Sequence, residues 1–179
     1  MAGSLAALAG CSGQPSVSLP PKSSPLSAPA ASSPSGQSSA RAAVTAAYTA
    51  YFPASKAAET GPADRAAATL SPYAAQPYLG KVLTQMAHYR ADDETAAGSV
   101  TPHITKITMH GKLAEVYDCQ DASHAALSST RTGKVLPGTS GSARTFLIAS
   151  LARGSDGRWR LTSLAHVDTS CSPAASPSS

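Results

Sequence analysis

Apolar residues recur at helical spacing in three stretches of the first half of the chain, residues 40–52, 63–70 and 77–90. This spacing places them on one side of a helix, which predicts three amphipathic helices. Pro53 is expected to end or kink the first helix, because proline lacks the N–H that a helix interior needs, with continuation of the alanine-rich run after it to Glu59 as the alternative. The apolar stripe of the first helix consists of Val44, Ala47, Tyr48, Tyr51 and Phe52.

Apolar and polar residues alternate in the second half of the chain, and this period of two predicts β-strands. Turns at residues 110–112 and 154–157 separate neighbouring strands and indicate antiparallel hairpins. Helices followed by antiparallel strands predict an α+β fold, with the sheet curling around the first helix. The predicted strands are residues 100–109, 113–119, 144–153 and 158–167.

Two connections carry no strong period. Residues 91–98 predict an acidic loop, and residues 120–141 predict a long polar loop with a small excursion near Gly133. In the last strand, alternation would place Trp159, Leu161, Ala165 and Val167 on one face, which leaves His166 pointing to solvent.

The N-terminal stretch is small and apolar up to Cys11. Leu-Ala-Gly-Cys at residues 8–11 resembles a bacterial lipobox, which implies cleavage before the cysteine and attachment of a diacylglycerol to its thiol. No basic residue precedes Cys11, and the apolar run is short for a signal peptide, so we expect residues 1–10 to be a truncated remnant of an export signal. The alternative is a tail with a stray cysteine.

Serine and proline dominate residues 12–39, and the end of the chain, residues 172–179, has a similar composition. Such segments bury too little apolar area to offset the entropy of ordering. We therefore expect a disordered tether over residues 11–39, anchored through Cys11, a folded domain over residues 40–171, and a disordered C-terminal tail.

Composition limits the possible partners of the 179-residue chain. Its net charge is +4, but the basic residues are scattered and form no patch, so nucleic-acid binding has little support. The 5 histidines are spread singly, and no metal or other cofactor is predicted. Alanine supplies much of the apolar content, so the core is thin, and a covalent cross-link would add stability.

Two cysteines remain beside Cys11, and both are placed just beyond predicted strand ends. An exported chain with such a pair favours a disulfide between Cys119 and Cys171. The alternatives are two unpaired thiols or Cys119 acting as a nucleophile.

Aromatic, methionine and acidic side chains on the facing sides of helices and strands are the candidates for lining a ligand site. They are Tyr48, Phe52, Met86, Tyr117 and Asp118. Alternation puts Asp118 on the face of Val116 and Tyr117 on the opposite face, and we expect Asp118 to fix the turn after its strand. A buried aspartate or histidine close to a tyrosine in a deep pocket would favour an enzyme. A pocket filled by Tyr48, Phe52 and Met86 would favour a scaffold.

Several pieces of this chain together resemble a group of secreted Gram-positive lipoproteins of the nuclear transport factor 2-like, or cystatin-like cone, superfamily. They are AYTAYFPA in the first helix, MAHYR in the third, Asp-Cys-Gln-Asp at residues 118–121, Trp159 and Cys171. The resemblance implies a curved antiparallel sheet closed by helices around a pocket. The superfamily includes isomerases, dehydratases and scaffold domains, so the fold does not fix the function.

The sequence therefore predicts a lipid-anchored extracytoplasmic binding or scaffold module, whose partner is a protein of the cell envelope or a small apolar ligand. The alternative is an enzyme of the isomerase or dehydratase type that uses the cone pocket.

Overall fold

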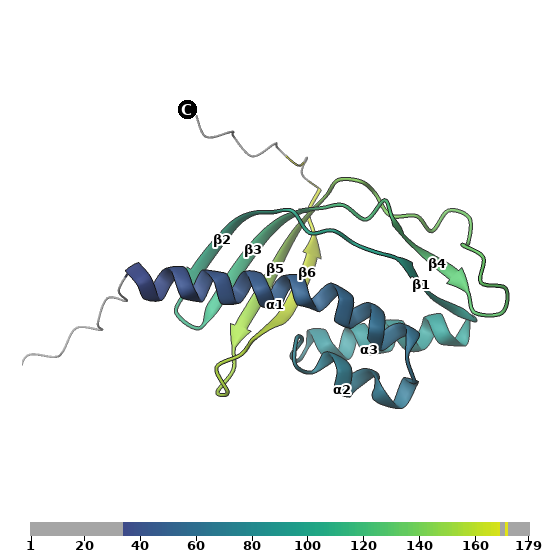
Figure 1. The fold of residues 1–179 in the computed structure, drawn as a ribbon, viewed down its shortest axis with the longest axis horizontal. Helices are drawn as coiled ribbons and strands as arrows, with labels where there is room; N and C mark the ends of the chain where they lie inside the picture. Colours follow the sequence, from purple (N-terminus) through teal and green to yellow (C-terminus); the bar gives the residue numbers. More distant parts are fainter. Residues whose placement is uncertain (1–33, 169–170, 172–179) are drawn as a thin grey trace, which may run out of the picture. The chain divides into compact units, whose positions relative to one another are not determined.

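The computed structural model describes residues 34–168 and Cys171. The fold is α+β, as predicted: helices come first, antiparallel strands follow, and the strands arch over α1 (Figure 1). The predicted anchor Cys11, most of the tether and the C-terminal tail lie outside the described residues. The helices are α1 (Pro34–Thr60), the 3-10 turn η1 (Ala63–Arg65), α2 (Ala66–Leu70) and α3 (Tyr78–Ala91). The strands are β1 (Glu94–Gly98), β2 (Ile104–His110), β3 (Leu113–Gln120), β4 (Ala125–Ser129), β5 (Thr145–Arg153) and β6 (Trp159–His166).

Helix α1 begins earlier than predicted and runs on past Pro53. It begins at Pro34 instead of residue 40, so the end of the predicted tether is helical, and it continues through Pro53 to Thr60. Pro53 therefore does not end the helix, and the alternative, continuation of the alanine-rich run to Glu59, is confirmed. A proline removes one intrahelical hydrogen bond, but Tyr51 before it and Ala58 after it are both buried in the same core and hold the helix in one piece.

One long hairpin of the chain builds parts of both sheets. β2 and β3 turn at Gly111, where φ is +62°, and the bridge between Thr101 and Asp121 carries the pairing on into β1 and β4. Residues 91–98 and 120–141, predicted as loops, therefore each contain a strand. Alanine and serine form these strands poorly by propensity, so the local sequence gave no β signal, and the strands form because the hairpin register continues.

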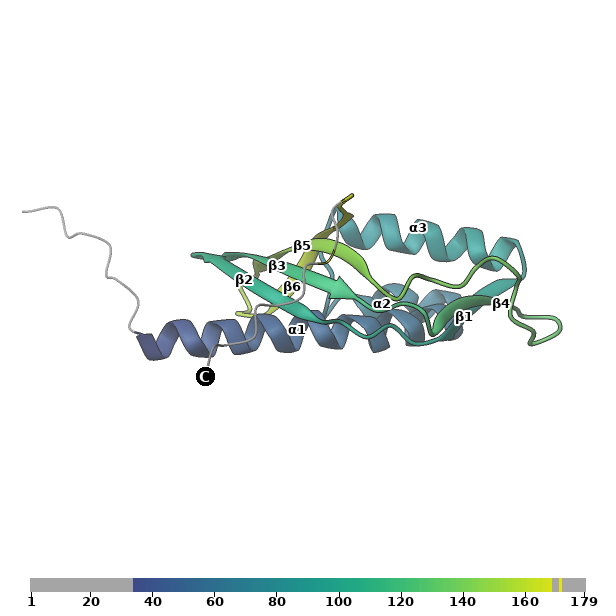
Figure 2. The same cartoon turned by 90° about the horizontal axis from the view of Figure 1, so that it is seen from above.

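The core lies between the helices and the inner face of the main sheet, whose strand order is β2-β3-β5-β6 (Figure 2). Both outer edges of this sheet are partly covered. The guanidinium of Arg41 donates a 2.5 Å hydrogen bond to the carbonyl of Ile107 on β2. On β6, Leu161 exchanges backbone hydrogen bonds of 2.8 Å with Tyr73 and Ala75.

An extra residue in β6 changes which side chains of that strand face the core. Trp159 and Leu161 are buried as predicted, but the register against β5 then shifts because Thr162 has no opposite residue. After this bulge Leu164 packs against the core and Ala165 is exposed, so the predicted single face over the whole strand is wrong.

Candidate functional site

The predicted pocket residues divide between the core, an open cavity and the outer face of the sheet. Tyr48 and Met86 are 0% and 2% exposed and fill the space between α1, α3 and the sheet. Phe52 stacks edge-on against Tyr48 and Tyr51, with ring centroids 5.2 and 5.4 Å apart. The interior of the cone next to Tyr48 is therefore packed with aromatic and aliphatic side chains.

Tyr48 and Asp118 meet in this packed interior although they are 70 residues apart in the chain. The Tyr48 hydroxyl donates to Asp118 Oδ2 at 2.7 Å, and the backbone N–H of His103 donates to Asp118 Oδ1 at 2.5 Å. Both side chains are 0% exposed. Alternation placed Asp118 correctly beside Val116, whereas the prediction that it fixes the following turn is wrong. Asp121 has that role, because it accepts hydrogen bonds from the backbone and hydroxyl of Ser123.

Burial shifts both groups of this pair toward their neutral forms. Desolvation raises the pKa of Asp118, although hydrogen bonds from Tyr48 and His103 act in the opposite direction. Desolvation also raises the pKa of Tyr48, and the adjacent carboxylate raises it further. Tyr48 is thus a fixed hydrogen-bond donor, and a substrate outside the core has no contact with either group.

Tyr117 lies on the outer face of the sheet, so its predicted place in the pocket is wrong. Its ring is 6.4 Å from that of Phe146, and Lys106 Nζ lies 5.1 Å from the ring centroid. Its hydroxyl donates to Glu115 at 3.0 Å. The alternation that pointed Asp118 inward already implied this outward position.

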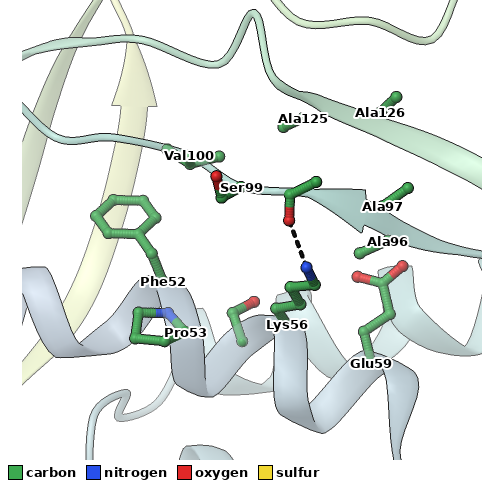
Figure 3. Close-up of a pocket in the computed structure, with 12 residues that line it drawn as sticks. Phe52, Pro53, Lys56, Glu59, Ala96, Ala97, Ser99, Val100, Ala125 and Ala126 are labelled. Atoms are coloured by element: carbon green, nitrogen blue, oxygen red, sulfur yellow. Dashed lines mark hydrogen bonds between the residues drawn. The ribbon is translucent and has the colours of Figure 1, made fainter.

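An open cavity lies farther along α1, between its second half and the β1–β4 sheet (Figure 3). Its volume is about 320 Å³. The ring of Phe52 closes one end, the backbone of β1 forms the upper wall, and alanine side chains supply much of the remaining surface. We call this cavity the β1 pocket; it is lined by Phe52, Pro53, Ser55, Lys56, Glu59, Ala96, Ala97, Gly98, Ser99, Val100, Ala125 and Ala126.

Two charged residues of α1 reach across the β1 pocket toward β1. The Lys56 ammonium donates a 2.6 Å hydrogen bond to the carbonyl of Gly98. Glu59 is half-buried, and its Oε1 has no hydrogen-bond partner among the described residues. Desolvation raises the pKa of Glu59, while the backbone N–H of Ala96 and the charge of Arg90 act to lower it. The pocket is therefore apolar along its walls and polar where α1 faces the edge of β1.

Cys119 and Cys171 form a disulfide with their Cα atoms 5.6 Å apart, as predicted. Cys119 pairs with Phe146 within β3, which runs one residue past the predicted strand end to Gln120. The bond ties the chain after β6 to the second strand of the main sheet.

No group of three or more His, Cys, Asp or Glu side chains that could hold a metal lies within residues 34–168 or at Cys171. In the same described part of the chain, no helix is long and apolar enough to cross a membrane. His166 is exposed to solvent, as predicted, with its side chain 60% accessible. The predicted alternation is not the reason, because after the bulge His166 pairs with the inward-facing Leu147 and lies at the end of β6.

Sequence reasoning missed Lys56, Glu59 and the alanines of β1 and β4. The two charged residues follow Pro53, where the first helix was expected to kink or end, and the alanines were assigned to loops. One signal was available: Lys56 and Glu59 are one helical turn apart and so share a helix face with Phe52.

Comparison with known proteins gives little beyond these observations. No protein-family model matches the chain, and no curated protein matches it. A solved structure from Catenulispora acidiphila is similar over 73% of this chain and 93% of that chain, with 13% sequence identity and a TM-score of 0.43. A likeness of this degree carries no argument, so the function has to be inferred from the residues of this chain.

Proposed function

We propose that this protein is a lipid-anchored extracytoplasmic binding module, and that its ligand is held in the β1 pocket between α1 and β1. The pocket lies at the small end of the volume range of ligand sites, and its walls are mainly apolar with a few polar groups. Lys56 and Glu59 supply those polar groups.

The observation that carries this proposal is the contrast between Asp118, which is fully buried, and the β1 pocket, which is open to solvent. The isomerase or dehydratase alternative needs an acid or base that touches the substrate. Asp118 is 0% exposed and has protein donors on both oxygens, which weighs against that alternative. The accessible cavity holds no tyrosine–carboxylate pair, and its features suit binding.

The anchor part of the proposal rests on Leu-Ala-Gly-Cys at residues 8–11 in front of a serine- and proline-rich stretch. The disulfide between Cys119 and Cys171 supports an oxidising location, because such bonds persist outside the cytosol. The α+β arrangement with an arched sheet is compatible with the resemblance to the cystatin-like cone lipoproteins. A diacylated cysteine brings two hydrophobic chains, which is what stable anchoring generally needs.

Binding in the pocket can be tested with the full oxidised chain and the fluorescent apolar dye 8-anilinonaphthalene-1-sulfonate. Ala96 lies on the α1 side of β1 (Figure 3), so Ala96→Phe should fill the pocket and weaken dye binding roughly tenfold or more. Ala68→Phe at an exposed position of α2 is the matched control.

The dye should also shift the backbone amide signals of residues 96–98 in the unmodified chain, a measurement that does not depend on the fold of a variant. Equal dye binding by both variants, with no shift at these amides, would contradict the pocket as the binding site.

The anchor is tested separately by exporting the chain in a Gram-positive host and extracting membranes with detergent. The unmodified chain should partition into detergent, and Cys11→Ala should not. Equal partitioning of the two would refute lipidation of Cys11.

A further inference from the structure

The edge of β1 that faces the β1 pocket is an unpaired strand edge. The β1–β4 sheet has two strands within the described residues, so β1 has a hydrogen-bonded neighbour on one side. In an antiparallel pair, alternate residues direct both backbone groups either toward the partner strand or away from it. The pattern in β4 shows which residues of β1 point away.

Leu127 stands opposite Ala96, and Ala125 stands opposite Gly98. Leu127 uses its backbone N–H and carbonyl on the far side of β4, and the Ala125 carbonyl likewise accepts from Gly141. The two residues of each pair are therefore not hydrogen-bonded to each other. Ala96 and Gly98 consequently direct their own N–H and carbonyl groups into the β1 pocket.

Side chains of α1 partly satisfy this edge in place of a strand. Lys56 donates to the Gly98 carbonyl at 2.6 Å, and the Glu59 carboxylate is stabilised by the Ala96 N–H. Lys56 thus acts as the donor that a neighbouring strand would supply, while Glu59 lies below Ala96 (Figure 3) with its Oε1 unpartnered among the described residues. The β6 edge of the main sheet differs, because residues 73–75 add backbone hydrogen bonds directly to it, whereas the β2 edge, like β1, accepts a hydrogen bond from a side chain of α1, that of Arg41.

We infer that the β1 pocket receives an extended peptide segment of a partner protein, which pairs with the free edge of β1 and takes over the hydrogen bond that Lys56 now makes to Gly98. This inference rests on the proposed binding function and names its ligand class. Addition of a strand to an exposed edge is an established mode of peptide recognition, with backbone hydrogen bonds giving affinity and small pockets giving selectivity.

The lining of the pocket limits the side chains of such a segment. The walls next to the edge come from the alanines of β1 and β4, and the volume of about 320 Å³ leaves room for small side chains. Lys56 and Glu59 bring one charge of each sign, so an uncharged peptide fits the pocket better than a strongly charged one. We therefore assign a segment rich in alanine, valine and serine.

The test uses the full chain labelled with ¹⁵N and a pool of blocked seven-residue peptides made from alanine, valine and serine. The matched probe is the same pool with N-methylated backbone amides, which keeps the side chains and removes the donors that strand pairing needs. The pool with unmodified amides should shift the amide signals of Ala96 and Gly98. The N-methylated pool should bind with an affinity at least roughly tenfold lower.

A variant tests the competition by the lysine. Lys56→Ala removes the group that occupies the Gly98 carbonyl and should strengthen binding of the pool with unmodified amides several-fold, since a competing hydrogen bond is gone. Lys81→Ala, at an exposed lysine of α3 outside the pocket, should leave binding unchanged.

Three outcomes would overturn the inference. Equal binding of both pools would mean that the pocket takes apolar groups without strand pairing, and it would leave the proposed binding function intact. No shift of the Ala96 and Gly98 signals with the pool of unmodified amides would exclude peptide addition, while the dye experiment decides on the pocket itself. A shift that grows with protein concentration alone would mean that a second copy of the chain occupies the edge.

Discussion

The main sheet and the β1–β4 sheet share one continuous hairpin of the chain, yet they differ in what covers them. In the main sheet, β3 buries every second residue from Ala114 to Asp118 against the helices. Among the described residues of the β1–β4 sheet, Ser128 alone is buried. The same backbone pairing thus gives a closed core at one end and an open pocket at the other.

Side-chain size explains this difference. The main sheet meets the helix residues Tyr48, Leu70 and Met86, whose side chains fill the space below it. The β1–β4 sheet presents alanines, which leave a gap toward α1 that no side chain of the described residues fills. The acidic residues beside the two sheets differ in the same way. Asp118 is fully buried and accepts from two donors, whereas Glu59 is half-buried and its Oε1 has no hydrogen-bond partner among the described residues. Stability should therefore be concentrated in the main sheet and binding in the β1–β4 sheet, which we call the extension.

The largest expected effect comes from the disulfide, which belongs to the main sheet. Cys119 and Cys171 are 52 residues apart, and the loop-closure entropy of such a cross-link is worth about 4 kcal/mol. Replacing both with serine should lower the free energy of unfolding in guanidinium chloride by about this amount. Cys11→Ser is the control and should have no effect. A double variant as stable as the unmodified chain would contradict the role of this bond.

Next comes a matched pair of leucines, one in each sheet. Leu161 is 0% exposed, so Leu161→Ala should cost about 3 kcal/mol of unfolding free energy through lost burial and a cavity. Leu127 on β4 is half-buried, and Leu127→Ala should cost about 1 kcal/mol because less area is removed from water. Equal losses in denaturant titrations would show that the extension is packed as tightly as the main sheet.

The sequence was sufficient where the periodic signal was strong. The stripe through Val44 and Tyr48 and the alternation around Asp118 predicted which side chains face the core. The contact between Tyr48 and Asp118 could not be predicted, because it depends on how the helix crosses a strand 70 residues away. The β1 pocket was missed because alanine-rich strands have low β propensity and form through pairing set by the neighbouring hairpin.

A smaller effect on stability is expected for the buried Asp118. Asp118→Asn loses one acceptor and should cost about 1–3 kcal/mol at low pH, where the carboxyl is already neutral. Burial raises the folded-state pKa of Asp118, so its contribution to stability is fully present below the usual value of 3.8 and is lost as the pH rises through the raised value. Unfolding measured from pH 3 upward should show this decline in the unmodified chain and a flatter profile in the variant. A parallel pH dependence in both chains would mean that Asp118 titrates normally.

The smallest effect should come from the corresponding change in the extension, Glu59→Gln. Glu59 also has a pKa raised by burial, so ionisation above its usual value of 4.5 costs stability, and the neutral amide avoids that cost. Because the side chain is only half-buried, solvent screens the charge, and the gain at neutral pH should stay within about 0.5 kcal/mol. Peptide-pool binding should change more than stability does, since Glu59 lies against the edge of β1 that a peptide would use. A stability change as large as that of Asp118→Asn, with unchanged binding, would mean that the extension is a second closed core, and the division between a stabilising sheet and a binding sheet would fail.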